Sequence, residues 1–114
     1  MSVNKVQEVN IEKGFPNVEA ALQKLKAFLT TSKRQGVKAV IVVHGYGSTG
    51  DGGAIKTAVL KCLRDKSMCG IVRDFSCGDE WINRKKEILN LCKSLESHER
   101  KISGNVGVTA VLLK

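Results

Sequence analysis

The sequence predicts an α/β domain in which strands and helices alternate along the chain. Segments 37–43 and 106–113 are almost continuously apolar, which is typical of strands covered on both faces. Segments 18–29 and 55–63 repeat apolar residues every three or four positions, as amphipathic helices do. The resulting order, β-α-β-α-β-α-β, favours at least two parallel strand pairs joined by right-handed crossovers. The helices can cover one face of the sheet or both, and both arrangements stay open.

The first half of the chain is expected to form a strand, a helix and a second strand. Residues 6–11 (VQEVNI) form the first strand. A helix follows, with Asn17 as its N-cap, because an Asn side chain accepts a hydrogen bond from the first helical N–H groups. Gly36 closes that helix as a left-handed residue. The inward face of the helix is expected to carry Val18, Ala21, Leu22, Leu25, Phe28 and Leu29.

The second half is expected to add two helices and two strands. Residues 71–75 alternate as a short strand, and Asp79 is expected to cap a helix over 80–97. The polar segment 96–105 (ESHERKISGN) is predicted to be a surface loop before the last strand. The inward residues of the two helices are expected to be Ile55, Val59, Cys62 and Leu63, then Trp81, Ile88, Cys92 and Leu95.

Composition indicates the class of partner and of compartment. With 42% hydrophobic residues among 114, the chain is large enough for one core, so we expect a single domain over 1–114. The net charge of +8 favours a polyanion such as nucleic acid, although solubility alone is the alternative. The four cysteines and two histidines form no CxxC pair and no zinc-finger spacing. No segment reaches the about 18 apolar residues of a membrane span, and no signal peptide is recognised, so we expect a cytoplasmic protein.

A glycine-rich corner follows the strand 37–43, in the segment HGYGSTGDGG. Residues without side chains let backbone N–H groups face a common space, and the start of the next helix adds further donors and a partial positive charge. This combination favours binding of a phosphate or another anion. The alternative is a connector whose glycines only make turns. The predicted phosphate-binding residues are Gly45, Tyr46, Gly47, Ser48, Thr49, Gly50, Gly52, Gly53 and Lys56.

His44 enters the corner and has two interpretations. It can be a general acid, a general base or a phosphate donor, or its ring can hold the loop in shape. Glu12 ends the first strand and lies beside His44 if the two strands are neighbours. GYGSTG also matches the dinucleotide fingerprint, with Asp74 roughly placed for a ribose, whereas Lys56 and Thr57 do not follow the glycine that an NTPase loop requires.

The strand, HGYG corner and helix together resemble the central motif of the Smr (small MutS-related) domain family. The segments VNIEKGFPNVEAALQKLKAFL and GNVGVTAVLLK resemble its opening strand and helix and its last strand. The resemblance implies a two-layer α/β sandwich with a mixed four-stranded sheet, similar to the C-terminal domain of translation initiation factor three. It also leaves residues 76–103 as a helical insertion specific to a subgroup.

The resemblance further implies nucleic-acid binding and, in some members, DNA nicking or RNA cleavage. His44, Gly45 and Gly47 match the HGxG motif, and Lys56 takes the place of a basic residue on the next helix. Active members tend to carry LDLHG at the first strand, whereas here Asn10 stands at the acid and Glu12 near the histidine.

We therefore expect a nucleic-acid-binding domain that contacts backbone phosphate at the corner. The first alternative is a weak endonuclease that uses His44 with Glu12 and, if needed, a divalent metal. The second is a small nucleotide-binding protein. DNA or RNA preference and oligomeric state stay open.

Overall fold

The computed structural model describes residues 5–12, 17–45 and 52–114 of the chain. The strands are β1 (Val6–Asn10), β2 (Ala39–Val43), β3 (Val72–Cys77) and β4 (Val108–Leu113). The α-helices are α1 (Val18–Arg34), α2 (Gly52–Arg64), α3 (Trp81–Leu91) and α4 (Glu99–Ile102). Three short 3₁₀ helices are η1 (Lys66–Met68), η2 (Gly78–Glu80) and η3 (Lys93–His98).

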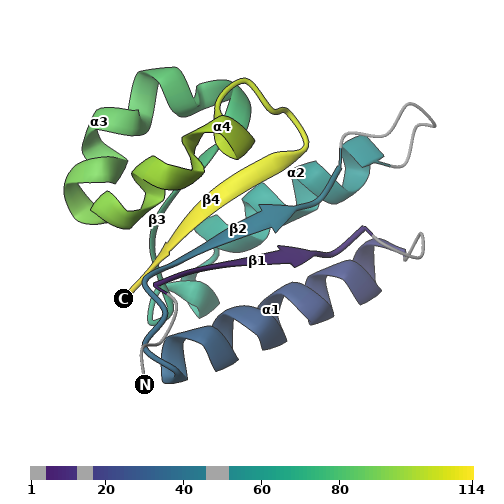
Figure 1. Cartoon of the computed structure of the whole chain (residues 1–114). Coiled ribbons are helices and arrows are strands. Elements are labelled where there is room, and N and C mark those ends of the chain that lie inside the picture. The colour runs from purple at the N-terminus through teal and green to yellow at the C-terminus, as the bar shows by residue number, and fades with distance from the viewer. Residues whose placement is uncertain (1–4, 13–16, 46–51) are drawn as a thin grey trace.

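The four strands form one mixed sheet in the order β1-β2-β4-β3 (Figure 1). β1 and β2 are parallel, whereas β4 is antiparallel to both β2 and β3. The predicted α/β class with a mixed four-stranded sheet is thus confirmed. The expectation of at least two parallel pairs was wrong, because β4 enters between β2 and β3. β3 runs in the direction of β1 and β2 but is hydrogen-bonded to neither.

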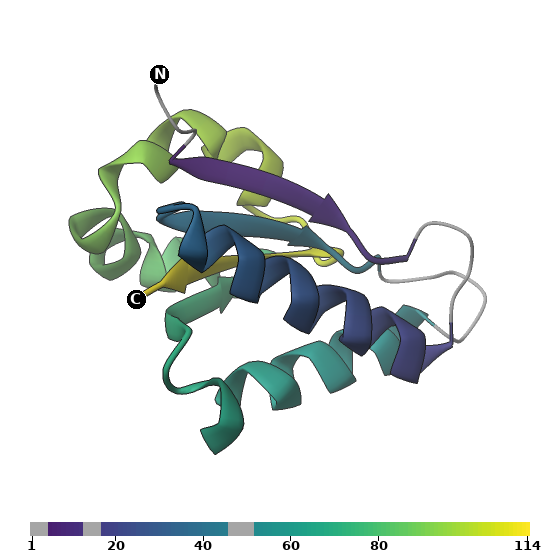
Figure 2. The same ribbon diagram turned by 90° about the horizontal axis from the view of Figure 1, so that it is seen from below.

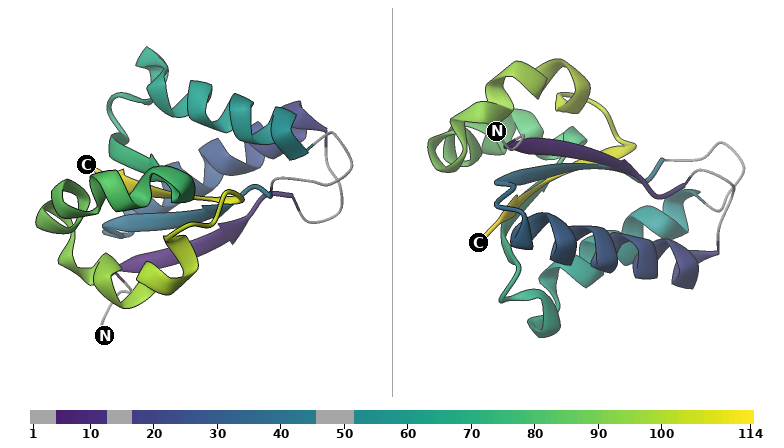
Figure 3. Two further views of the ribbon diagram at one scale, coloured as in Figure 1. Left: turned by 90° about the horizontal axis from the view of Figure 1, so that it is seen from above. Right: turned by 60° about the horizontal axis from the view of Figure 1, so that its bottom comes forward.

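Helices lie on both faces of the sheet (Figure 3). α1 and α2 cover one face, while α3, η3 and α4 form a layer on the other face. The sheet therefore lies between two helical layers, which is one layer more than the expected two-layer sandwich has. Of the two arrangements that the sequence left open, the structure has the helices divided between the faces. The buried residues accordingly form two clusters, one between the sheet and each helical layer.

β2 and β4 explain the two continuous apolar runs. Both are interior strands, and all six residues of β4 are buried. In β2, Val40 and Val42 pack toward α1 and α2, while Ala39 and Ile41 pack toward α3 and α4. Since alternate side chains of a strand face opposite sides, a strand covered on both faces needs apolar residues at every position.

The ends of α1 confirm the predicted caps. The Asn17 side chain accepts a hydrogen bond from the backbone N–H of Ala20 at 2.7 Å. Gly36 follows Gln35, the C-cap, with a φ of 81°, in the left-handed region where a side chain would be strained. Of the helices in the described part of the chain, none combines the length and the apolarity that crossing a membrane requires.

The segment after β3 differs from its predicted form. The helix expected over 80–97 ends at Leu91, because the backbone leaves helical geometry at Cys92 with a φ of −147°. The chain then forms η3 and α4, so part of the predicted loop 96–105 is helical. Leu95 and Ile102, both fully buried against the sheet, hold these short helices in place. Asp79 lies inside η2 rather than capping α3.

Different strand termini meet at the two ends of the sheet. Val6, Ala39 and Leu112 stand side by side at the end where β1 begins and β4 finishes. Asn10, Val43 and Val108 mark the opposite end, where β1 and β2 finish.

Gly78 is the point where η2 meets the chain leading into β4. A Cβ at this position would overlap the carbonyl oxygens of Ile102 and Asn105, while a Cβ at Gly70 would meet open space. We expect Gly78→Ala to lower the free energy of unfolding by roughly 1–3 kcal/mol, because backbone atoms must shift. Gly70→Ala should change it by less than about 1 kcal/mol. Urea denaturation of both variants tests this, and equal stabilities would contradict it.

Candidate functional site

The carboxyl ends of β1 and β2 and the amino ends of α1 and α2 lie at the same end of the molecule (Figure 2). β1 and β2 are paired up to Asn10 and Val43, and the Ile11 N–H donates to the Val43 carbonyl oxygen at 3.0 Å. The pairing therefore brings the residues after β1 beside those after β2. Glu12 and the His44–Gly45 pair, predicted to be neighbours only if their strands were, do lie together.

Gly45 is the residue at which three segments meet. Its φ of 72° lies in the left-handed region that favours glycine, and a Cβ there would overlap the Glu12 carboxylate, so that flexible side chain would have to move. Its N–H donates to the Gly107 carbonyl oxygen at 3.0 Å. A Cβ at Gly107 would in turn lie 3.2 Å from the Gly45 Cα. The Gly45 amide, predicted to face a ligand, is thus used within the protein.

His44 is fully buried and bonded at both ring nitrogens. Nδ1 lies 2.9 Å from the Gly45 carbonyl oxygen, and Nε2 lies 2.8 Å from Thr109 Oγ1. Because a carbonyl oxygen only accepts, Nδ1 carries the proton, and neutral Nε2 accepts from the Thr109 hydroxyl. The backbone N–H of His44 also donates to the Gly107 carbonyl oxygen at 3.0 Å. This geometry is the one that the loop-organising interpretation of His44 requires.

The electrostatic surroundings keep the His44 ring neutral. Burial lowers its pKa from the ordinary value of 6.5, because the charged form loses its hydration. The Gly45 carbonyl opposes that shift, whereas the positive charge of Lys56 adds to it. His44 is therefore a neutral hydrogen-bonding bridge between the end of β2 and the middle of the sheet.

Asn10 organises the turn that follows β1. Its side-chain oxygen accepts a hydrogen bond from the Glu12 N–H at 3.0 Å, and its carbonyl oxygen accepts one from Lys24 Nζ at 2.8 Å. Asn10, which stands at the acid of the LDLHG pattern, thus fixes the backbone that positions Glu12 beside Gly45.

Lys56 lies one turn into α2 and bonds to η2. Its Nζ is 3.1 Å from Asp79 Oδ1, and its side chain is 12% exposed against 43% for Asp79. A hydrogen bond from the Cys77 thiol and the contact with Lys56 hold the pKa of the Asp79 carboxyl below its usual value. The lysine predicted to meet a phosphate is thus bonded to a carboxylate of its own chain.

The remaining predicted residues fall into two groups. Gly52 and Gly53 open α2, whose first turn contains no acidic residue. Tyr46, Gly47, Ser48, Thr49 and Gly50 lie outside the described residues. In the described ranges, no group of three or more His, Cys, Asp or Glu side chains is close enough to hold a metal ion.

Sequence reasoning missed Thr109, Gly107 and Asp79 as parts of this site. Thr109 had a signal, because it is a polar residue within the apolar run 106–113, and a buried hydroxyl needs a hydrogen-bond partner. Gly107 and Asp79 had no comparable signal, since their partners are distant in the sequence.

A sequence model of the Smr domain matches residues 13–79, which is more than half of the chain. The chain belongs to the Smr domain family. The match contains the β2–α2 corner and ends at Asp79, so α3, α4 and β4 follow it. Smr domains generally bind nucleic acid or nick it.

Among solved structures, the Smr domain of Thermus thermophilus MutS2 has a similar fold. The TM-score is 0.59 at 24% sequence identity, over 95% of this chain and 98% of that chain. A comparison with curated proteins found no match. The family predicted from the HGYG corner is thus confirmed, together with its fold.

The buried neutral His44 makes the stability of this Smr domain depend on pH. Because its pKa is lower in the folded chain than the ordinary 6.5, the unfolded chain binds more protons between the two values. We expect the free energy of unfolding to fall as the pH drops through 6.5, by at most about 1.4 kcal/mol per pH unit.

The test is urea denaturation at a series of pH values between about 8 and 5.5. The same measurement is made in the variant His98→Gln, because His44 is then the single histidine in the sequence. The loss of stability should persist in that variant, and a free energy that stays flat across the range would contradict the prediction.

Proposed function

We propose that this Smr domain binds nucleic acid by gripping backbone phosphate at the end of the molecule where β1 and β2 finish and α2 begins. The observation that carries the proposal is the meeting of these three termini, of which the end of β2 and the start of α2 lie within the residues that match the family. A ligand site at the carboxyl ends of parallel strands is usual for α/β folds.

The start of α2 is the proposed phosphate contact. A 13-residue helix has N–H groups without a partner inside the helix, and a partial positive charge, at its amino end. Because its first turn has no acidic side chain, no carboxylate of that turn competes for these donors. The two glycines that open the helix let a phosphate oxygen approach the backbone closely. Tyr46, Gly47, Ser48, Thr49 and Gly50 belong to the proposed site as its loop.

His44 and Glu12 are assigned a positioning role in this proposal. His44 fixes Gly45 to the sheet, and Glu12 fills the space that the missing Cβ leaves. A nuclease mechanism would need His44 to exchange a proton with a phosphodiester, but both ring nitrogens are bonded within a buried site. Binding without cleavage is therefore the function that the geometry supports best.

The dinucleotide alternative is supported less well. It requires that the strand following the helix lie next to β2 and carry an acid at its end, but β4 separates β3 from β2. Asp74, the candidate acid, bonds to Arg84 at 2.7 Å on the far edge of the sheet. The fingerprint in GYGSTG therefore lacks the ribose partner that the fold would have to supply.

We also propose a cytoplasmic location. All four cysteines are free thiols, and two of them, Cys62 and Cys92, are buried among apolar residues. Free thiols of this kind persist in reducing compartments.

The first test removes the lysine of the site. Lys56→Gln should weaken binding to duplex DNA or structured RNA roughly three- to tenfold at low salt, because one phosphate contact is lost. The slope of log K against log salt should become shallower by about 0.7–0.9. Fluorescence anisotropy at several salt concentrations measures both quantities.

Lys93→Gln is the matched control, since it removes the same charge from η3, beyond α3. It should change affinity less than Lys56→Gln does. Equal effects would mean that only the net charge matters, and wild-type binding that does not respond to salt would contradict phosphate contact altogether.

The second test removes Asp79, one internal partner of Lys56. Asp79 bonds to the Lys56 ammonium group that would contact a phosphate in the proposed site. Asp79→Asn should therefore tighten nucleic-acid binding several-fold at low salt. Glu99→Gln is the control, because it removes the same charge and releases Lys85 from a comparable contact of 3.2 Å on the other helical layer. An equal gain in both variants, or none for Asp79→Asn, would contradict a competition at Lys56.

A further inference from the structure

β3 is an edge strand of the sheet, so among the described residues no strand lies beside one side of its backbone. Edge strands expose N–H and C=O groups that can pair with a strand of another molecule. In an antiparallel pair, successive residues point these groups alternately toward the partner and away from it. The N–H and C=O of Phe75, in the middle of β3, both bond to side chains.

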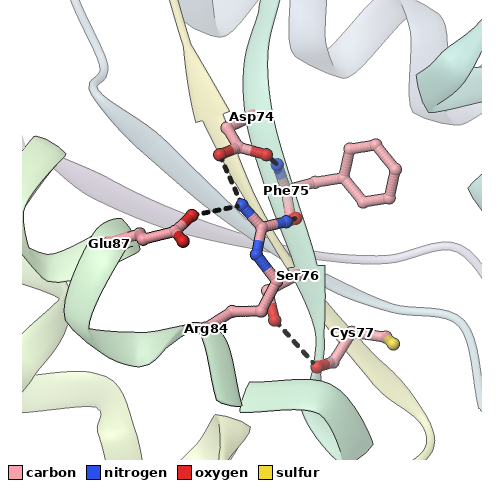
Figure 4. Close-up of polar contacts among 6 residues, drawn as sticks. All are labelled: Asp74, Phe75, Ser76, Cys77, Arg84 and Glu87. Atoms are coloured by element: carbon pink, nitrogen blue, oxygen red, sulfur yellow. Dashed lines mark hydrogen bonds and ion pairs between the residues drawn. The ribbon is translucent and has the colours of Figure 1, made fainter. Parts of the chain in front are cut away.

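Asp74 and Arg84 occupy both backbone groups of Phe75 (Figure 4). Asp74 Oδ1 accepts from the Phe75 N–H at 2.8 Å, and Arg84 Nη1 donates to the Phe75 carbonyl oxygen at 2.9 Å. Arg84 Nη2 closes the arrangement by bonding to Asp74 Oδ2 at 2.7 Å. One carboxylate and one guanidinium thus imitate the two bonds that a neighbouring strand would make.

Two further features lie along the same strand. The pairing register of β3 with β4 shifts between Val72 and Asp74, which leaves Arg73 as an extra residue. At the other end, the Ser76 hydroxyl donates to the Cys77 carbonyl oxygen at 3.1 Å. Bulges and side chains that occupy backbone groups are means by which proteins prevent pairing at an edge.

We propose that the edge of β3 is a strand-pairing surface for a second copy of this chain, and that Asp74 and Arg84 keep it closed. This proposal does not depend on the nucleic-acid site.

The residues of β3 fit a second copy of themselves. Antiparallel pairing about a two-fold axis at Phe75 would set Asp74 opposite Ser76 of the other copy and Arg73 opposite Cys77. Like charges do not stand opposite each other in this register, and the two Phe75 rings form a cross-strand pair. A groove of about 390 Å³ lies beside Phe75, Ser76 and Cys77, between α2 and α3, and Arg84 is part of its wall. Removing Arg84 would widen that space.

The experiment replaces both side chains that bond to the backbone of Phe75, in the double variant Asp74→Ala with Arg84→Ala. In light scattering coupled to size exclusion, the double variant should shift with concentration from 12.4 kDa to twice that mass, while the unaltered chain stays at 12.4 kDa. Amide hydrogen exchange at Phe75 should slow in the dimer, because its N–H then bonds to the other copy.

Glu87→Ala is the matched control. Glu87 bonds to Arg84 at 3.1 Å in the same cluster but does not touch the backbone of Phe75, so this variant should stay monomeric. Where the double variant fails to fold, Arg84→Gln alone opens the Phe75 carbonyl while keeping the aliphatic stem. A folded double variant, or a folded Arg84→Gln, that stays at 12.4 kDa at every concentration would overturn the proposal. Dimerisation of Glu87→Ala to the same extent would overturn it too.

Discussion

The hydrogen bonds that converge on Gly107 and Thr109 hold together the end of this Smr domain where β1 and β2 finish. The Gly107 carbonyl oxygen accepts from two consecutive N–H groups, those of His44 and Gly45, and Thr109 bonds to the His44 ring. β2 is thereby fixed to β4 beyond the last residue pair of the two strands. The chain continues toward α2 from this fixed point, and β1 reaches the same place through the contact of Glu12 with Gly45.

This arrangement gives the two helical layers a common boundary at the corner. α2 belongs to the layer that packs with α1, whereas η2 leads into the layer that packs on the opposite face. The ion pair of Lys56 with Asp79 joins them across the edge of the sheet. In the proposed site, a phosphate and Asp79 compete for one ammonium group, so the layer outside the family match influences the affinity of the part inside it.

Much of the fold could be predicted because burial controls the sequence pattern. The apolar runs of β2 and β4, the spacing in α1 and the cap at Asn17 all report local constraints. The strand order could not be predicted, because an apolar run such as β4 fits any interior position, and its place depends on where the preceding helices return the chain. The predicted end of α3 was wrong because packing against the sheet, and not the repeat of one continuous helix, places Leu95 and Ile102.

The site shows the same division between local and distant partners. The corner was predicted from glycines that adjoin His44, but the role of His44 depends on Thr109, which is 65 residues away in the sequence. Lys56 was placed correctly on its helix, yet its partner is 23 residues further on. A sequence pattern reports which residues need partners, and the tertiary structure decides which partners they find.

The positions of the strand ends have a consequence for how the domain can be joined to other proteins. β1 starts and β4 finishes at the side of the sheet opposite the corner, where Val6 and Leu112 stand on either side of Ala39. Polypeptide fused before β1 or after β4 would extend from that far side. An affinity tag, a solid support or a neighbouring module attached there would lie away from the end of the sheet where β1 and β2 finish, which is the end that carries the proposed site.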